Sequence, residues 1–167
     1  MPDGGADRIL EVTVEIPSGS RNKYEYDHER HRFVLDRVLY SSVHYPCDYG
    51  FIDGTLAEDG DPLDVLVLLD EPTFPGCHIH ARPVAVFWMQ DEAGPDAKVL
   101  CVPSTDPRQA AITDLDSLPG YLLDEIGHFF DVYKALEPGK GTETRGWQGR
   151  EAAEAAVEDA RRRYKAE

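Results

Sequence analysis

Three aspartates lie close together in the string Asp59-Gly60-Asp61-Pro62-Leu63-Asp64. Gly60 and Pro62 indicate a turn, and the apolar run Val65–Leu69 begins directly after it, so the turn is held against a buried strand. Carboxylates about 6 Å apart repel by roughly 3 kcal/mol at an effective dielectric constant of 20. Divalent cations with oxygen ligands would offset this repulsion, so the string favours a metal site over a solvated acidic turn.

The string does not fit a calcium-binding EF-hand loop, which needs oxygen ligands at positions 1, 3 and 5 and a glutamate at position 12. Counted from Asp59, position 5 is Leu63 and position 12 is Asp70. The stretch from Val38 to Ala81 contains eight carboxylates and no lysine or arginine. A cluster of aspartates without neighbouring cations strengthens the metal interpretation.

A second acidic group, Asp91-Glu92-Ala93-Gly94-Pro95-Asp96, follows the apolar strand Val84–Met89, and Lys98 comes two residues later. Alone, this group is typical of a hairpin turn with charged tips. Two carboxylate clusters at strand ends in one small protein make a shared site for several metal ions the better interpretation.

Basic and phenolic side chains lie near these carboxylates in the predicted strands. Lys23 and Glu25 share one face of a strand, Arg37 lies on another strand with Asp36 pointing the other way, and Tyr133-Lys134 ends a helix. In a chain of net charge −15, inward-facing cations beside metal carboxylates imply an anionic ligand. Phosphate suits both kinds of partner.

The elements that must position these residues change type along the chain. Strands are predicted at 9–16, 23–27, 33–39, 65–69, 79–89 and 98–102, with a turn-rich stretch between the third and fourth. Helical spacing follows over Pro119–Leu136 and Arg150–Glu167, and residues 1–8 form a flexible polar tail. Strands first and helices last predict an α+β domain over residues 9–167, with the strands in a closed barrel or strongly curled sheet.

Composition narrows the classes of partner. The chain has 167 residues, a mass of 18.7 kDa and a sequence pI of about 4.7. That acidity disfavours binding to nucleic acid and to anionic membranes. With three widely spaced cysteines and no signal peptide or transmembrane run, we expect a cytoplasmic protein.

The ordered motifs resemble the soluble family I inorganic pyrophosphatases, most closely the short, actinobacterial-type bacterial members. The resemblance covers about residues 9–140 and rests on Glu15-Ile16-Pro17, Lys23-Tyr24-Glu25, Asp36-Arg37, Tyr45-Pro46-Cys47-Asp48-Tyr49-Gly50, Asp59-Gly60-Asp61-Pro62-Leu63-Asp64-Val65, Asp91-Glu92 with Asp96 and Lys98, and His128-Phe129-Phe130 with Tyr133-Lys134.

This resemblance implies a five-stranded OB-like β-barrel with flanking helices, two of them C-terminal. It also implies Mg²⁺-dependent hydrolysis of pyrophosphate to two phosphates, by direct in-line attack of a metal-activated water, in a homohexamer. Several Mg²⁺ ions would bind in each active site. Mn²⁺ or Zn²⁺ would be substitutes, and Ca²⁺ would inhibit.

The resemblance also assigns roles. Asp59, Asp64 and Asp96 would bind the first metal, Asp91 and Asp96 a metal that arrives with substrate, and Glu15 and Glu25 another. The phosphate-binding groups would be Lys23, Arg37, Tyr49, Lys98, Tyr133 and Lys134. Asp61 and Asp96 are the candidates for the proton acceptor. Asp61 is favoured because two metal ions bound to Asp96 would lower the pKa of Asp96 and make Asp96 a weaker base.

Three other functions compete with this interpretation. A metal-dependent hydrolase of nucleotide polyphosphates would need an additional aromatic or apolar pocket for the base. A noncatalytic OB-type module for single-stranded nucleic acid would need a basic groove. A Ca²⁺-binding module would show no turnover. His78 and His80 share a strand face, but without a third ligand nearby in sequence they are interpreted as ordinary surface histidines, as are His28 and His31. Cys47 is interpreted as a packing residue.

Overall fold

The computed structural model describes residues 8–167. The flexible tail predicted for residues 1–8 lies, except for Arg8, outside the described residues. Arg8 forms an ion pair with Glu154, with 3.7 Å between Nε and Oε1.

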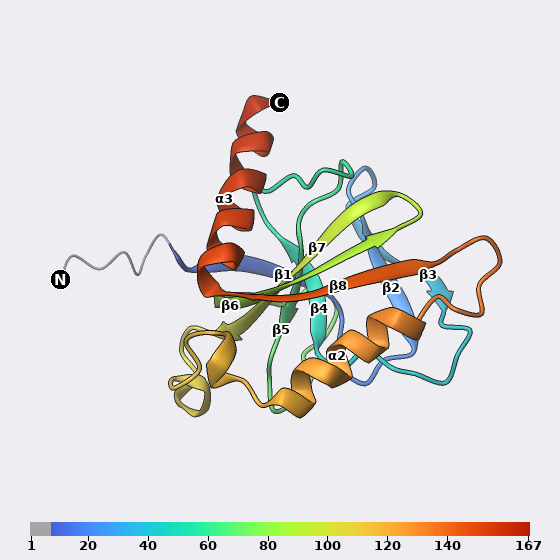
Figure 1. Ribbon diagram of the computed structural model, residues 1–167. Helices are drawn as coiled ribbons and strands as arrows, with labels where there is room; N and C mark the ends of the chain where they lie inside the picture. The colour runs from blue at the N-terminus through green and yellow to red at the C-terminus, as the bar shows by residue number, and fades with distance from the viewer. Residues whose placement is uncertain (1–7) are drawn as a thin grey trace.

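Five strands form a closed barrel (Figure 1). They are β1 (Leu10–Ile16), β4 (Asp48–Ile52), β5 (Asp64–Val67), β6 (His78–Asp91) and β7 (Gly94–Pro103). They follow the order β1-β4-β5-β7-β6, and pairing of β1 with β6 closes the ring. Only β5 and β7 pair in parallel among the described strands of this ring. The predicted α+β fold with a five-stranded barrel is confirmed.

Two further strand elements extend the barrel. A separate hairpin is formed by β2 (Asn22–Asp27) and β3 (Arg32–Val38), and β8 (Thr142–Gly149) pairs with β6. In Figure 1 the hairpin lies on the same side as the end of α2 (Gly120–Val132), while α3 (Arg150–Ala166) lies on the other side of the barrel. Short 3-10 helices occupy Pro107–Gln109 and Leu115–Ser117. Within residues 8–167 no helix has the length and apolar character needed to cross a bilayer.

Successive residues of the central strands face two different clusters, because side chains alternate along a strand. Val65, Val67 and Val99 pack with residues from every barrel strand and with the α3 stripe of Ala153, Val157 and Ala160. Leu66 and Leu100 point the other way, toward Ile126, Phe129 and Phe130 of α2. The central strands are therefore buried on both faces, as the run Val65–Leu69 predicted.

Two strands were not predicted. β4 falls inside the stretch interpreted as turns, although all five of its residues are buried. Its Gly50 allows β4 to approach β1, because a Cβ there would lie 2.0 Å from the carbonyl oxygen of Thr13. The other strand, β8, is polar except for Trp147 and has no hydrophobic alternation to reveal it.

The first predicted helix ends earlier than expected. α2 stops at Val132, and residues 133–137 continue as tight turns in which Ala135 N–H donates to Val132 O and Glu137 N–H donates to Lys134 O. The prediction of helix to Leu136 was wrong at this end. These turns carry Tyr133 and Lys134 toward the β6–β7 hairpin.

Candidate active site

A cavity of about 190 Å³ collects every residue that the sequence assigned to the site. Side chains reach it from the first four strands, the turn before β5, the β6–β7 hairpin and the segment after α2. The predicted residues that line it are Glu15, Lys23, Glu25, Arg37, Tyr49, Asp59, Asp61, Asp64, Asp91, Asp96, Lys98, Tyr133 and Lys134. The fold thus brings both acidic clusters and the cations into one place.

Lys98 lies at the centre of this cavity. In the parallel pair of β5 and β7, Asp64 is opposite Lys98, and Asp96 lies two residues earlier on the same face of β7. The Lys98 ammonium is 2.6 Å from Asp64 Oδ2, 2.7 Å from Asp96 Oδ2 and 2.8 Å from the Tyr49 hydroxyl. Its side chain is 3% exposed, so a buried cation holds two carboxylates together.

Burial raises the pKa of three carboxyl groups in the cavity. Burial raises the pKa of Asp96 to about 6, although Lys98 opposes this rise and Asp64 adds to it. Burial likewise raises the pKa of Glu15 to about 7, even though the Tyr26 N–H donates to Glu15 Oε2 at 2.9 Å. Burial also raises the pKa of Asp59. Buried carboxylates of this kind are the oxygen ligands that hard divalent cations take.

The aspartate-rich turn has the geometry that its sequence predicted. Gly60 adopts φ +90°, which favours glycine. The Asp61 N–H donates to Asp59 Oδ1 at 3.0 Å, and Asp61 O accepts from the Ala57 N–H at 2.7 Å. These bonds fix the turn and present the exposed Asp61 carboxylate beside that of Asp59 at the cavity.

Lys23 and Arg37 of the β2–β3 hairpin both contact the carboxylate of Asp36. Asp36 Oδ2 lies 3.3 Å from Lys23 Nζ and 2.6 Å from an Arg37 terminal nitrogen, so the prediction that Asp36 points away was wrong. Lys23 pairs with Arg37 and Tyr24 with Leu35, which leaves Asp36 as the extra residue of a β-bulge. Such bulges redirect side chains. Arg37 Nε also lies 2.6 Å from Oε1 of the buried Glu137.

Lys134 joins the segment after α2 to the β6–β7 hairpin. Its ammonium lies 3.2 Å from both Asp91 Oδ2 and Glu92 Oε1. Burial would raise the pKa of Asp91, but the Ala93 N–H and Lys134 outweigh burial and lower it. The acidic group forms the turn of the β6–β7 hairpin, and its Asp91 and Asp96 line the cavity.

Several lining residues were not predicted from the sequence. Lys140 lines the cavity, and Glu137 contacts the lining residue Arg37. In the sequence Glu137 is marked only by its position three residues after Lys134, and that spacing alone does not indicate a functional residue. His28, interpreted as an ordinary surface histidine, lies at the edge of the cavity with its ring centroid 4.9 Å from that of Tyr26 and 5.1 Å from that of Phe51.

Comparison with known protein families identifies the family to which this chain belongs. The family model for inorganic pyrophosphatase matches residues 12–165. The chain belongs to the inorganic pyrophosphatase family. It is thus an enzyme of the hydrolase class, as the motifs predicted.

Similar pyrophosphatases come from bacteria and archaea. The chain is 58% identical over 156 residues to the inorganic pyrophosphatase of Streptomyces coelicolor, covering 93% of this chain and 96% of that protein. It is 54% identical over 157 residues to that of Methanosarcina acetivorans, covering 94% and 93%. The solved pyrophosphatase structure from Thermus thermophilus superposes with a TM-score of 0.94 at 46% identity, covering 99% of this chain and 97% of that one.

Proposed function

We propose that this chain hydrolyses inorganic pyrophosphate to two phosphates in a Mg²⁺-dependent reaction, by direct in-line attack of water. The observation that carries the proposal is the convergence of carboxylates with lysine, arginine and tyrosine side chains in one small cavity. Membership of the pyrophosphatase family supports the choice of substrate. Residues 9–167 would act as a single catalytic domain.

The carboxylates fit a set of Mg²⁺ ligands. The residues that would hold the ions are Glu15, Glu25, Asp59, Asp64, Asp91 and Asp96. Their oxygen-only chemistry suits a hard cation, and burial raises the pKa of Glu15 and of Asp96, which supports the proposal because a bound cation would favour their ionised forms. Bound Mg²⁺ supplies that charge and lowers the pKa of water. The same ligands would accept Mn²⁺ or Zn²⁺, whereas the larger Ca²⁺ would bind without activity.

The cations and tyrosines would hold the substrate. Those assigned to the phosphoryl oxygens are Lys23, Arg37, Tyr49, Lys98, Tyr133 and Lys134. Glu137 and Asp36 fix the direction of the Arg37 guanidinium, and Asp91 fixes Lys134. Preorganised cations of this kind neutralise the charge that develops on the departing phosphate.

Asp61 would accept the proton of the attacking water or orient that water. It lies on the turn that presents the proposed metal ligands, and its exposed carboxylate faces the cavity. Asp96 is the other candidate, but it is also a proposed ligand of two metal ions. Bound metal ions would lower the pKa of Asp96 and make it a weaker base.

The direct test is phosphate release from pyrophosphate with Mg²⁺ and after exhaustive chelation. We expect turnover only with the metal. Full activity after EDTA treatment would refute the proposed metal dependence, and no activity under either condition would refute the proposed reaction.

One observation favours testing nucleotide polyphosphates as substrates too. A second cavity of about 500 Å³ adjoins the first and shares Tyr26, His28, Phe51 and Pro62 with it. Aromatic walls of this kind suit a nucleobase. If ATP is hydrolysed as efficiently as pyrophosphate under Mg²⁺, the second function replaces the first.

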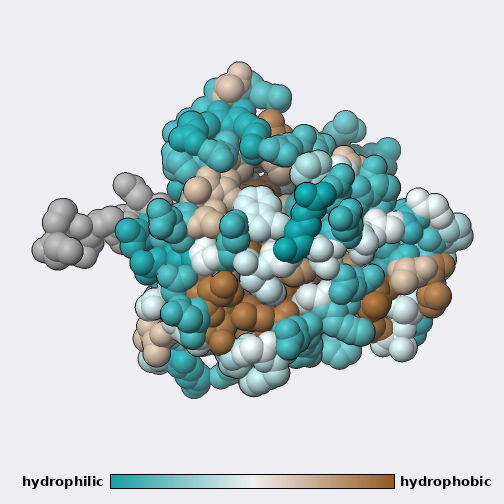
Figure 2. Space-filling view, viewed as in Figure 1, coloured by the Kyte–Doolittle hydropathy of each residue, from teal (hydrophilic) through white to brown (hydrophobic). Residues whose placement is uncertain are grey.

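We further propose a cytoplasmic homohexamer that binds neither nucleic acid nor membranes, consistent with the net charge of −15. Figure 2 shows hydrophobic side chains at the surface over α2 and toward β3. Leu35 of β3 is 53% exposed, and Phe74 in the loop after β5 is 63% exposed. Apolar side chains exposed to this extent are typical of surfaces that contact other subunits.

A further inference from the structure

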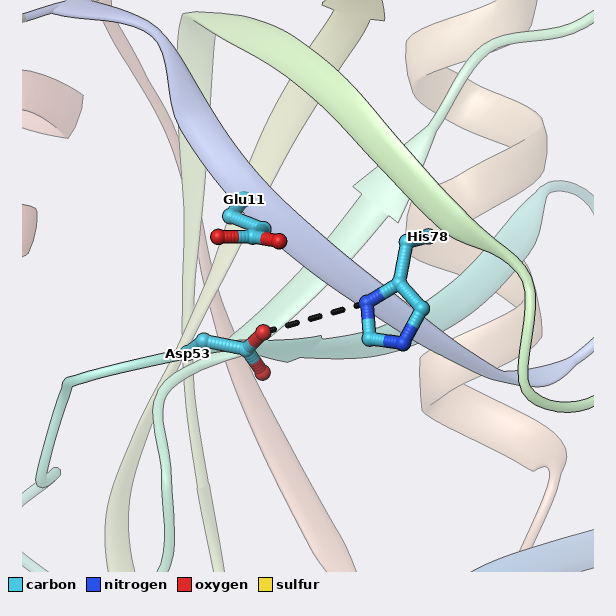
Figure 3. Close-up of side chains that lie close together, drawn as sticks. All are labelled: Glu11, Asp53 and His78. Atoms are coloured by element: carbon cyan, nitrogen blue, oxygen red, sulfur yellow. Dashed lines mark ion pairs between the residues drawn. The ribbon is translucent and has the colours of Figure 1, made fainter.

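A second group of metal-ligating side chains lies outside the pyrophosphatase cavity. Glu11, Asp53 and His78 each place a ligand atom within 4.8 Å of the others (Figure 3). His78 Nδ1 lies 3.9 Å from Asp53 Oδ2, the pair marked by the dashed line in the figure. Glu11 comes from β1, Asp53 directly follows β4, and His78 starts β6.

The register of the sheet explains why these side chains meet. In the antiparallel pair of β1 and β6, Thr13 is opposite His78 and Glu11 is opposite His80. On the other side of β1, the Asp53 N–H donates to the Glu11 carbonyl at 3.0 Å. Directly opposite residues project to the same face of a sheet, with Cβ atoms about 5 Å apart. β1 therefore places Glu11 between the segments that carry Asp53 and His78.

A buried hydroxyl holds the group in place from beneath. Thr13 is 6% exposed, donates to Asp53 Oδ1 at 2.9 Å and lies 3.4 Å from His78 Nδ1. His78 Nδ1 faces both the Thr13 hydroxyl and Asp53, so it is the imidazole nitrogen turned toward the group. Hydrogen bonds from a second layer of residues orient metal ligands in this way.

The group is open to solvent. The side chains of His78 and Asp53 are 62% and 36% exposed, and with Thr13 they line the 500 Å³ cavity. An ion can reach them without any opening of the barrel.

We propose that Glu11, Asp53 and His78 bind a divalent transition metal, with Zn²⁺ the best match, at a site separate from the Mg²⁺ carboxylates. Imidazole nitrogen combined with carboxylate oxygen suits Zn²⁺, for which water would complete the coordination, whereas Mg²⁺ prefers oxygen alone. Glu15 of the first cavity lies four residues further along β1, beyond a shift in its pairing with β4 and about 13 Å away. The two sites therefore share a strand but no ligand.

The test is calorimetric titration with Zn²⁺ of protein held in excess Mg²⁺, so that the active-site carboxylates are occupied. We expect native protein to bind one more equivalent of Zn²⁺ per chain than His78→Ala. Asp53→Asn should raise the Kd for that additional Zn²⁺ ion at least tenfold. His44→Ala, at an exposed histidine outside the cluster, should match native protein.

Two comparisons separate this site from the active site. Asp64→Asn, which removes a proposed Mg²⁺ ligand, should keep the extra equivalent of Zn²⁺, and His78→Ala should keep Mg²⁺-dependent hydrolysis of pyrophosphate. Melting temperatures without Zn²⁺ show whether each variant is folded. The proposal is overturned if native protein, His78→Ala and Asp53→Asn give the same isotherm, or if Asp64→Asn removes the equivalent.

Discussion

The ammonium nitrogen of Lys98 lies 2.6 Å from Asp64 Oδ2, where the start of β5 pairs in parallel with the middle of β7. Burial alone would lower the pKa of Lys98, but Asp64, Tyr49 and Asp96 outweigh it and raise that pKa well above its usual value. Lys98 is thus charged and acts as the counter-ion of proposed metal ligands. When Mg²⁺ neutralises these carboxylates, the Lys98 ammonium would be free to bind a phosphoryl oxygen of the substrate.

Lys98→Met should therefore destabilise the metal-free protein far more than the Mg²⁺-bound protein. Removing one partner of a buried ion pair costs about 3–5 kcal/mol. We expect a loss of roughly 3 kcal/mol in the free energy of unfolding without metal, most of it recovered with Mg²⁺, in urea denaturation. Lys140→Met, at a more exposed lysine of the same cavity, is the matched control and should change little. Equal losses with and without Mg²⁺ would contradict this role of Lys98.

Mg²⁺ should stabilise the fold at constant ionic strength. A ligand that binds only the native state at a hundredfold excess over its Kd adds about 2.7 kcal/mol. The melting temperature should rise in native protein and much less in Asp59→Asn/Asp64→Asn. Ca²⁺ should raise the melting temperature as well but support little hydrolysis, because it is larger and coordinates less tightly. An unchanged melting temperature in millimolar Mg²⁺ would mean that the aspartate turn is no metal site.

Asp61→Asn and Asp96→Asn should separate the two candidate proton acceptors. Asp61→Asn should lower kcat by two or more orders of magnitude, within the range for a general base, and leave Mg²⁺ affinity nearly intact. Asp96→Asn should weaken Mg²⁺ binding as well as the rate, because its carboxylate is a proposed ligand. The measurements are metal titration and kcat at saturating Mg²⁺. Loss of rate without loss of metal in Asp96→Asn alone would reverse the assignment.

The metal-free protein should lose stability as the pH rises from about 5 to 8. The folded-state pKa values of Glu15 and Asp96, about 7 and about 6, lie above the ordinary values of 4.5 and 3.8. The folded state therefore binds more protons than the unfolded state in this range, and its advantage disappears as the pH rises through those values.

Urea midpoints across this pH range measure the effect. Glu15→Gln should flatten the curve, and saturating Mg²⁺ should cancel or reverse the slope because the metal binds the ionised carboxylates. A metal-free midpoint that does not vary between pH 5 and 8 would count against buried, partly protonated carboxylates.

Sedimentation should give a mass of six times 18.7 kDa at micromolar concentration. Leu35→Asp and Phe74→Asp, which place charge on exposed apolar positions, should lower that mass, whereas Glu29→Gln on the loop between β2 and β3 should not. A particle of about 19 kDa in native protein would refute the oligomer.

Local patterns in the sequence predicted most of the fold. The alternation of Leu10, Val12, Val14 and Ile16 gave β1, and the unbroken apolar run after Asp64 gave the doubly buried β5. β4 could not be predicted in this way, since Gly50 is required by a contact with Thr13 on another strand. β8 is set by pairing with β6 and not by its own polar residues.

The site was predictable to the extent that its residues lie in short motifs. Asp59, Asp61 and Asp64 share one turn, and their placement follows from it. The orientation of Asp36 depends on a bulge, and the contact of Glu137 with Arg37 depends on how the chain turns after α2. The meeting of Glu11, Asp53 and His78 depends on the register of three strands, which no single segment reveals.

Closure of the barrel by β1 and β6 has a kinetic consequence. The pair joins Leu10 to Ala81, so the ring can form only after a long loop of chain has closed. Chains dominated by such distant contacts fold slowly, in milliseconds to seconds. Glu15, a residue of the proposed active site, lies on β1 just after the residues that pair with β6. Catalytic activity during refolding should therefore return in step with ring closure, behind the signal of α3, which can form from local contacts.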